Sequence, residues 1–459
     1  MLSNDILDAI FQTARAKGAT FTEVFIERSS GQKIRLLDSK VHEVGGGVEF
    51  GIGVRLLRDA DVSYGYTNSP AKKDLIALTE SLGGLLDAKP FNHPHTLQSL
   101  PAPKTGAKED SSQNLRRAAE FLQIVNQTAR KHHSNIVQVD ANLSLRRREI
   151  WIFNDEGLSK YEQLPYTRTM LQAVAARPGE QEIGSISPGA TMGVDFLATL
   201  KPEDLGVEIA RQAVTKLGAT LCPGGVMPVL LGNGFGGVIF HEACGHLLET
   251  TSVQKKASVF HDKMGQQIAH EAVNAYDDAT VPSAWGTFGC DDEGHPSQKT
   301  KLIEKGILKS FLVDYVGHLK TGHRRTGSGR RQSYHYAPGS RMSNTFIAPG
   351  PHSLDDMLAS IDHGLYCTHL GGGSVQPGTG EFNFAALECY LVEKGKITKP
   401  LKGATLIGSG PEILQKISMV GNDFKLMAGM CGSASGSVPV TVGQPSLKID
   451  SILVGGKNS

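Results

Sequence analysis

Apolar and polar residues follow two different periods in the first part of the chain. The N-terminal stretch repeats apolar residues at helical spacing, whereas the stretches after it alternate or run apolar as strands do. A second stretch with helical spacing follows them. We therefore expect, in chain order, a helix over residues 4–17 with Asn4 as its N-cap, strands over 21–30, 32–40 and 41–57, and a helix near 72–85.

Residues 87–113 interrupt this pattern, because they are rich in Pro, His, Lys and Ser. Such a composition is typical of a linker. Beyond it the pattern predicts a helix near 115–131, strands over 135–154 and 160–176, a helix near 202–217 and a break at 217–225. From there short strands and glycine turns predominate around one prominent helix.

These elements predict an α+β fold. An N-terminal α/β region of helices and antiparallel strands, residues 1–220, would precede a strand-rich C-terminal domain, residues 221–459. A further boundary inside the first region is expected near 87–113.

Composition argues against nucleic-acid-binding, membrane and disulfide-rich proteins. The 459 residues carry a formal net charge of +1, which gives no general attraction to nucleic acid or to an anionic membrane. No apolar run approaches the length of a membrane span, and the amphipathic N-terminus lacks the apolar core of a signal peptide. The six cysteines are scattered without a CxxC pair. We therefore expect a cytoplasmic protein with no nucleic-acid or membrane partner and no disulfide framework.

The prominent helix carries His-Glu-x-x-x-His, formed by His241, Glu242 and His246. Two neutral ring nitrogens and a carboxylate are what a water-activating zinc hydrolase needs. A separation of five residues, however, places the two rings about 140° apart on an ideal α-helix. We therefore predict a bulged or distorted turn between the histidines, with Gly245 as the natural place for it. Two unrelated histidines on a helix are the alternative interpretation.

A catalytic zinc site usually takes three protein ligands. Glu249 lies three residues after His246, on a compatible helix face. Cys431 is the rival, since it lies in a glycine- and serine-rich stretch typical of an irregular loop. A lone cysteine is more often a small buried apolar residue, so the residues alone leave the third ligand open.

Gly232, Gly234 and Gly237 form GxGxxG just before this helix. The pattern is typical of dinucleotide-binding proteins, but the acidic residue expected about twenty positions later is missing. We therefore interpret the glycines as a tight turn from a strand into the helix.

Basic residues cluster further along the chain. Arg330 and Arg331, preceded by Arg324 and Arg325, are either a clamp for a substrate carboxylate or peptide backbone, or a solvated loop. Nearby, His335 and Tyr336 are candidate donors to the oxyanion of a reacting carbonyl, although ordinary packing is the commoner role of such residues.

Two stretches together resemble a known family. HEACGHLLE at 241–249 and MCGSASGSVPVTVGQPSLKIDSILVGG at 430–456 are similar to the TldD side of the TldD/PmbA family, which is described as cytoplasmic zinc metallopeptidases. Stretches that begin at Asp291, Thr326 and Gly380 resemble the family in the same order. The likeness covers the second half of the chain and, more loosely, the first.

The resemblance implies a catalytic, HExxxH-containing member whose C-terminal domain carries the metal-binding helix. By this likeness His241, His246 and Cys431 would hold one Zn²⁺ per chain, and Glu242 would be the general base. Glu249 would orient a histidine by accepting its ring N–H. The substrate would be an unfolded or small peptide, and the chain would form a homodimer or a heterodimer with a related subunit.

We therefore expect a zinc-dependent metallopeptidase. Two alternatives stay open at this point. One is a non-catalytic peptide-binding or maturation partner with a structural metal, which a closed four-residue site would favour. The other is an amidohydrolase that tailors a modified peptide.

Overall fold

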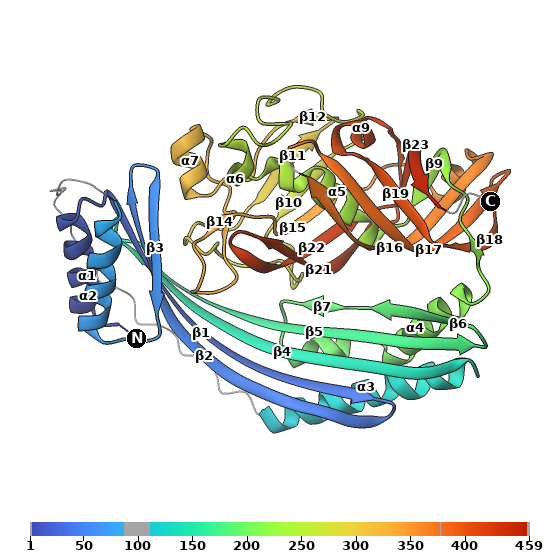
Figure 1. Cartoon of the computed structure of the whole chain (residues 1–459), viewed down its shortest axis with the longest axis horizontal. Helices are drawn as coiled ribbons and strands as arrows, with labels where there is room; N and C mark the ends of the chain where they lie inside the picture. The colour runs from blue at the N-terminus through green and yellow to red at the C-terminus, as the bar shows by residue number, and fades with distance from the viewer. Residues whose placement is uncertain (1, 87–110, 377, 457–459) are drawn as a thin grey trace.

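The computed structural model describes residues 2–86, 111–376 and 378–456. The first half forms one antiparallel sheet in the order β3-β2-β1-β4-β5-β6, with β7 beside β5. Figure 1 shows the long strands of this sheet curving beneath the second half of the chain. The strands are β1 (Phe21–Leu37), β2 (Lys40–Arg58), β3 (Asp61–Thr67), β4 (Ile136–Asn154), β5 (Ser159–Arg177), β6 (Glu180–Ile186) and β7 (Gly189–Ala190).

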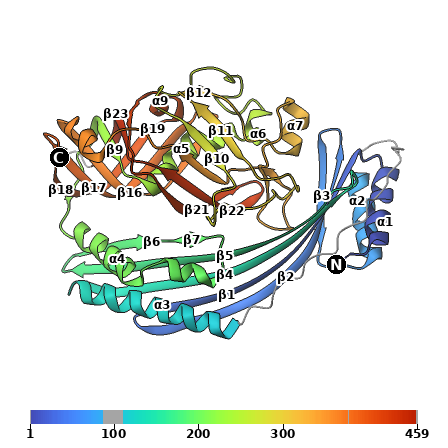
Figure 2. The ribbon, with the colours of Figure 1, turned by 180° about the vertical axis from the view of Figure 1, so that it is seen from behind.

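Helices cover the two ends of this sheet. At one end, α1 (Asn4–Ala16) and α2 (Lys72–Gly84) pack on β1 and β2 in one apolar cluster. At the other end, α3 (Ser111–His132) and α4 (Pro202–Lys216) form a second cluster with β4 and β5, joined by the 3-10 turn η1 (Val194–Thr199). Figure 2 shows α3 and α4 lying next to each other along the strands.

Two expectations for this half are wrong, and a third lies mostly outside the described residues. Residues 21–30 and 32–40 do not form two strands, because β1 runs unbroken over Phe21–Leu37 and pairs with β2 on one side and β4 on the other. Asn4 is not the N-cap of α1: Ser3 holds that position, and its side chain makes no capping hydrogen bond. Of the expected linker 87–113, residues 87–110 lie outside the described part, and α3 already begins at Ser111.

The second half contains two larger sheets. One runs β12-β11-β10-β15-β22-β21, so that β21 is its edge strand. The other runs β16-β9-β23-β19-β17-β18-β8, and a further pairing of β16 with β17 closes part of it into a ring. The short helix α5 packs against strands of both sheets. This mixture of helices and sheets confirms the α+β fold class.

The element bounds of this half are as follows. The strands are β8 (Thr220–Leu221), β9 (Gly225–Leu231), β10 (Ala275–Asp278), β11 (Lys299–Glu304), β12 (Ile307–Leu308), β13 (Gly329–Arg330), β14 (Gly339–Ser340), β15 (Asn344–Ile347), β16 (His363–Gln376), β17 (Glu381–Glu393), β18 (Lys396–Lys402), β19 (Ala404–Ser409), β20 (Ile417–Val420), β21 (Lys425–Ser433), β22 (Gly436–Gln444) and β23 (Leu447–Gly455). The helices and 3-10 turns are η2 (Gly234–Gly237), α5 (Val238–Ala243), η3 (Gly245–Leu248), α6 (Thr250–Val253), α7 (Tyr315–Thr321), α8 (Leu354–Ala359) and α9 (Gly410–Gln415).

A buried ion-pair network joins the long sheet to the second half. Arg55 of β2 lies 2.6 Å from Glu23 of β1 and 2.7 Å from Glu293. Arg331 also pairs with Glu23. Other members of the network are Arg148, Glu27, Asp292 and Arg325. Because each buried charge has an opposite charge beside it, the network holds the two halves in a defined orientation.

Candidate metal centre

Glycines let the chain turn sharply from β9 into α5. A Cβ at Gly237 would lie 2.7 Å from the backbone nitrogen of Gly443, and Gly234 has a φ angle of +69°, which few other residues adopt. The backbone nitrogen of Gly232 donates a hydrogen bond to the carbonyl of Cys367. The GxGxxG pattern therefore serves a tight turn between a strand and a helix, as the sequence predicts.

The helix that carries the histidines is broken between them. α5 ends at Ala243, Cys244 has φ −134° and ψ −52°, and the 3-10 turn η3 begins at Gly245. The predicted distortion is therefore present, but it is a break into a 3-10 turn and not a π-bulge. Gly245 contributes through packing, because a Cβ there would lie only 2.1 Å from the sulfur of Met342.

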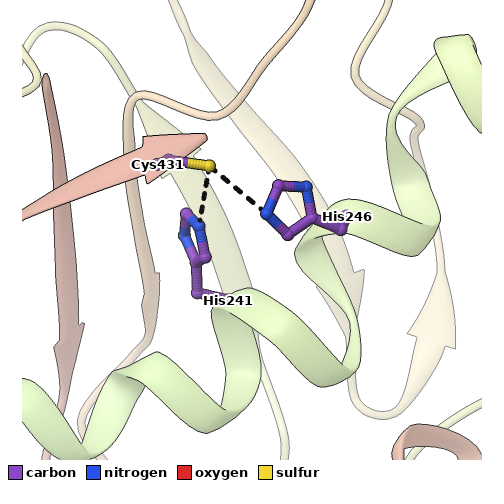
Figure 3. Close-up of side chains that lie close together, drawn as sticks. All are labelled: His241, His246 and Cys431. Carbon is purple, nitrogen blue, oxygen red and sulfur yellow. Dashed lines mark hydrogen bonds between the residues drawn. The ribbon is translucent and has the colours of Figure 1, made fainter. Parts of the chain in front are cut away.

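The break lets both imidazole rings face one sulfur atom (Figure 3). Nε2 of His241 and Nε2 of His246 each lie 3.2 Å from Sγ of Cys431, which β21 supplies. The two rings are nearly perpendicular, at 84°, with their centroids 5.0 Å apart. The structure thus brings together three donor atoms from two segments that lie 185 residues apart.

Two glutamates flank these donors. Oε2 of the buried Glu249 lies 3.0 Å from Nδ1 of His246, so an Nδ1–H can donate to it and leave Nε2 free to act as a ligand. Oε2 of the partly exposed Glu242 lies 3.8 Å from Nε2 of His246. Glu242 therefore lies beside the donors, and Glu249 lies behind one of them.

The neighbours of each titratable group shift its proton affinity. Burial opposes ionisation of the Cys431 thiol, but His241 and His246 outweigh burial and hold the pKa of that thiol well below its usual value. Burial likewise disfavours a charged His246, but Glu249 and Cys431 outweigh it and raise the pKa of His246 well above its usual value. Burial raises the pKa of Glu242, against the effect of both histidines. A carboxyl group with a raised pKa is suited to accept and return a proton near neutral pH.

This donor set fits a tetrahedral zinc ion. With usual bond lengths, nitrogen and sulfur ligands of one such ion lie about 3.6 Å apart. The observed separations of 3.2 Å are close to this value. Two imidazoles and an ionisable thiol are also ligand types that zinc prefers.

One other group of His and acidic side chains lies close together within the described residues: Glu208, His369 and Glu388. Arg211 already donates to both of these carboxylates, at 2.8 Å to each. The arginine therefore occupies the position that a cation would take, and this group serves as a contact between α4 and the strands β16 and β17.

The two arginines singled out in the sequence are buried. Arg330 donates to the backbone carbonyls of Met342 and Pro439. Arg331 pairs with Glu23 and donates to the carbonyl of Asp292 at 2.9 Å. Both guanidinium groups are thus engaged by groups of the protein itself.

His335 and Tyr336 follow on the same loop. The His335 ring packs edge-on against Tyr66 of β3, with centroids 4.7 Å apart, and its Nδ1 lies 3.1 Å from Oγ of Ser333. The half-buried Tyr336 donates its backbone N–H to the carbonyl of Ser333. The His335 ring therefore lies where the loop meets the long sheet, and Tyr336 closes a turn of that loop.

The sequence interpretation missed Arg341. Its guanidinium is 1% exposed, contacts the backbone of Cys431 and approaches Glu249. No local pattern marks it, because a single arginine before Met-Ser-Asn fits no periodicity or motif.

A groove of about 540 Å³ lies between the long sheet and the second half. Residues 46–49 of β2 and 144–146 of β4 line one side of it, and Trp285, Met430 and Pro439 line the other. Met430 is the neighbour of Cys431 on the edge strand β21. Successive side chains of a strand point to opposite faces, so Met430 faces the groove, whereas the thiol of Cys431 points to the buried face of β21.

Within the described residues, no helix is both long and apolar enough to cross a membrane.

Three family models match the chain. They describe the PmbA/TldA metallopeptidase domain 1 over residues 22–85, its central domain over 108–217 and its C-terminal domain over 224–456. A relative from Haemophilus influenzae, named metalloprotease TldD homolog, is 36% identical over 100% of this chain and 97% of its own length. A relative from Methanothermobacter thermautotrophicus, named metalloprotease, is 30% identical over 95% of each chain.

Solved structures share the fold. A DNA gyrase modulator candidate from Thermotoga maritima superposes with a TM-score of 0.78 at 22% identity, covering 98% of this chain and 99% of that one. TldE from Thermococcus kodakarensis gives a TM-score of 0.77 at 20% identity, covering 98% and 100%. Since the family models match most of the chain and the relatives align along its whole length, the chain belongs to the PmbA/TldD metallopeptidase family.

Proposed function

We propose that this chain is a zinc-dependent metallopeptidase that hydrolyses peptide bonds in unfolded or small peptides. The observation that carries the proposal is the approach of both imidazoles to Sγ of Cys431, at 3.2 Å each, with a carboxylate beside them. We assign His241, His246 and Cys431 as the ligands of one Zn²⁺. A zinc ion held there supplies Lewis acidity, which polarises a peptide carbonyl and lowers the pKa of water.

Glu242 is the proposed general base. Its carboxylate lies 3.8 Å from the ring of His246 and remains partly open to solvent. It would take a proton from the attacking water and deliver it to the departing amide nitrogen. Glu249 would hold His246 in the tautomer whose Nε2 lone pair is free. Arg330 and Arg331 stay outside the proposed site, because both are buried and bonded within the protein.

The substrate class is inferred from two features near the proposed ligands, the edge strand that carries Cys431 and the groove that Met430 lines. Cys431 lies on an edge strand, and an extended peptide can add to such an edge through backbone hydrogen bonds. The groove that Met430 lines has room for an extended chain, and such a chain would pass around the edge of β21 to reach the proposed ligands on the other face. Recognition through the backbone would give a peptidase with broad sequence tolerance.

A non-catalytic partner with a structural metal is the second candidate. It would need a closed site of four protein ligands. Glu249 is the residue nearest to such a role, but its Oε2 lies against Nδ1 of His246. This contact supports an orienting role for Glu249 and leaves the fourth position for water. An amidohydrolase acting on a modified peptide would use the same residues and would differ only in its substrate.

The location and assembly are also part of the proposal. All six cysteines are free, which suits a reducing cytoplasm. We infer that the chain pairs with a second copy or a related subunit, and the shared fold with TldE is compatible with such a subunit. Light scattering of the purified chain, alone and mixed with a related chain from the same source, measures this.

The decisive experiment compares the wild type with Glu242→Gln on a pool of unfolded peptides. Glu120→Gln on the exposed face of α3 is the matched control, and zinc content is measured in all three proteins. We expect equal zinc in all three and cleavage slowed by about 10²- to 10⁴-fold in Glu242→Gln alone. Equal cleavage by all three would remove the proposed base. No cleavage by any zinc-loaded form would favour the non-catalytic or the tailoring alternative.

A further inference from the structure

The proposed ligands come from different parts of the fold. The histidines follow β9, a strand of the ring-forming sheet, whereas Cys431 lies on the edge of the other large sheet. An error of a few tenths of an ångström between them would weaken any metal site. Some element must therefore fix the strand of the thiol relative to the segment of the histidines.

We propose that Arg341 is this positioning residue: it ties the backbone at Cys431 to Glu249 and, through Glu249, to His246. The inference rests on the proposed metal centre. It adds a residue that contacts neither the metal nor the substrate and acts through the ligands.

One side of the guanidinium holds the hairpin between β21 and β22. One terminal nitrogen donates to the backbone carbonyl of Cys431. The other donates to Oγ of Ser435 at 3.0 Å and to the carbonyl of Gly436 at 2.7 Å. These three bonds fix the end of the edge strand, in addition to its pairing with β22 and to the bond from the N–H of Gln332 to the carbonyl of Ser435.

The other side of the guanidinium faces Glu249. Nε of Arg341 lies 3.8 Å from Oε1 of Glu249, and both atoms are buried without a hydrogen-bond partner among the described residues. The second oxygen, Oε2, is the one that meets His246. The carboxylate is therefore shared, with one oxygen toward the histidine and the other toward the arginine. Within the described residues, Arg341 is the arginine that forms an ion pair with Glu249, so its removal would leave this buried carboxylate without that counter-charge.

The backbone of Arg341 is itself held in place. Its N–H donates to the carbonyl of Ser328 at 2.8 Å. The preceding Ser340 donates its hydroxyl to the carbonyl of Leu312, and the N–H of Leu312 donates to Leu248 at the end of η3. The backbone beside Arg341 is thus linked, through Ser340 and Leu312, to the segment that carries His246.

This arrangement requires one side chain whose hydrogen-bond donors point in several directions. A guanidinium presents donors along several edges of one plane, whereas a lysine ammonium is a single point at the end of a flexible stem. Lysine could reach either the hairpin carbonyls or Glu249, but not both. Arg341→Lys therefore keeps the charge and removes the bridge.

The test measures binding of Co²⁺ to the metal-free chain, since thiolate ligation gives cobalt a charge-transfer absorption band. Wild type, Arg341→Lys, Arg341→Met and Arg55→Lys are titrated. Arg55 is an equally buried arginine that belongs to the network between the halves. We expect Co²⁺ to bind about 10- to 100-fold more weakly to both Arg341 variants, with a weaker thiolate band at saturation. Arg55→Lys should melt earlier and keep both metal properties.

The outcomes separate the two proposals. If the wild type binds no Co²⁺ with a thiolate band, the proposed metal centre fails. If the wild type binds and Arg341→Lys matches it in affinity and band intensity, the positioning role fails while the metal centre stands. A double-mutant cycle with Glu249→Gln tests the histidine side: strictly additive losses would show that Arg341 does not act through Glu249. If Arg341→Met does not fold, the lysine variant carries the test.

Discussion

Replacing Gly245 with alanine tests the packing of the break between the two histidines. The φ angle of Gly245 is not in the left-handed region, so the cost of alanine there is steric. The new Cβ would lie 2.1 Å from Sδ and 3.0 Å from Cε of Met342. Comfortable contacts begin near about 3.5 Å, so the sulfur would have to move by roughly 1.4 Å. Met342 is fully buried in the main core of the second half, so its side chain would have to move against packed neighbours.

Overpacking of this kind costs about 1–3 kcal/mol. Because a methionine side chain is flexible, we expect the lower part of that range, about 1–2 kcal/mol of the free energy of unfolding. The displacement also reaches His246, the next residue. We therefore expect zinc affinity to fall about 10-fold. Urea unfolding of the metal-free chain measures the first quantity, and competition with a coloured chelator measures the second.

Substitution of Met342, alone and together with Gly245→Ala, tests the same contact from its other side. Met342→Ala alone leaves a cavity and costs about 2–5 kcal/mol. In the double variant the alanine at position 245 fills part of that cavity, so the combined loss should be smaller than the sum. Gly84→Ala is the control, since a Cβ there meets nothing within 4 Å. Additive losses, or a Gly245→Ala variant that is as stable as the wild type and binds zinc as tightly, would refute the reasoning.

Three further predictions follow from the contacts. Glu293→Gln should lower the free energy of unfolding in urea by about 3 kcal/mol, the lower end of the cost of breaking a buried ion pair. It removes one of the two counter-charges of the buried Arg55, which keeps Glu23, and the carboxylate that pairs with the partly buried Arg325. The exposed Glu43→Gln should leave the free energy of unfolding unchanged. Burial and the charge of Glu293 raise the pKa of Asp314 to about 6. The protonated carboxyl of Asp314 therefore adds to the free energy of unfolding below about pH 4, and this contribution is lost as pH rises through about 6. Asp314→Asn should make the free energy of unfolding, measured in urea, depend less on pH across that range. Cys431→Ser should abolish the thiolate band of the Co²⁺ form and weaken metal binding, and an unchanged band would assign the sulfur ligand elsewhere.

The periods of apolar residues predicted the four longer helices α1 to α4 and the long strands β2, β4 and β5, because each such element satisfies a local rule. They failed within β1. Ser29, Ser30 and Gly31 are typical of a turn, yet they continue the strand, since β2 and β4 pair with them on both sides. Pairing along two edges outweighs the weak local preference of three residues. This pairing joins residues more than 100 positions apart, which no local window contains.

The proposed metal centre was likewise predictable only in its local part. His241, Glu242, His246 and Glu249 lie within one short segment, so their spacing alone suggested the chemistry and the distorted turn. Cys431 could not be chosen over Glu249 from the residues, and only the family resemblance pointed to it. The contact that supports Cys431 as the proposed ligand is the 3.2 Å separation of its Sγ from each ring, which depends on the packing of two sheets.

Arg330 and Arg331 show why a basic cluster cannot be interpreted from the sequence alone. Successive residues of an extended chain point to opposite sides. Arg330 accordingly meets carbonyls of the second half, while Arg331 reaches Glu23, 308 residues away on the long sheet. A buried guanidinium is stable only where such acceptors are supplied, and the sequence gives no sign of partners that distant. The pair that follows Gly329 resembles a solvated loop or a substrate clamp for this reason, although the contacts of Arg331 join the two halves of the molecule.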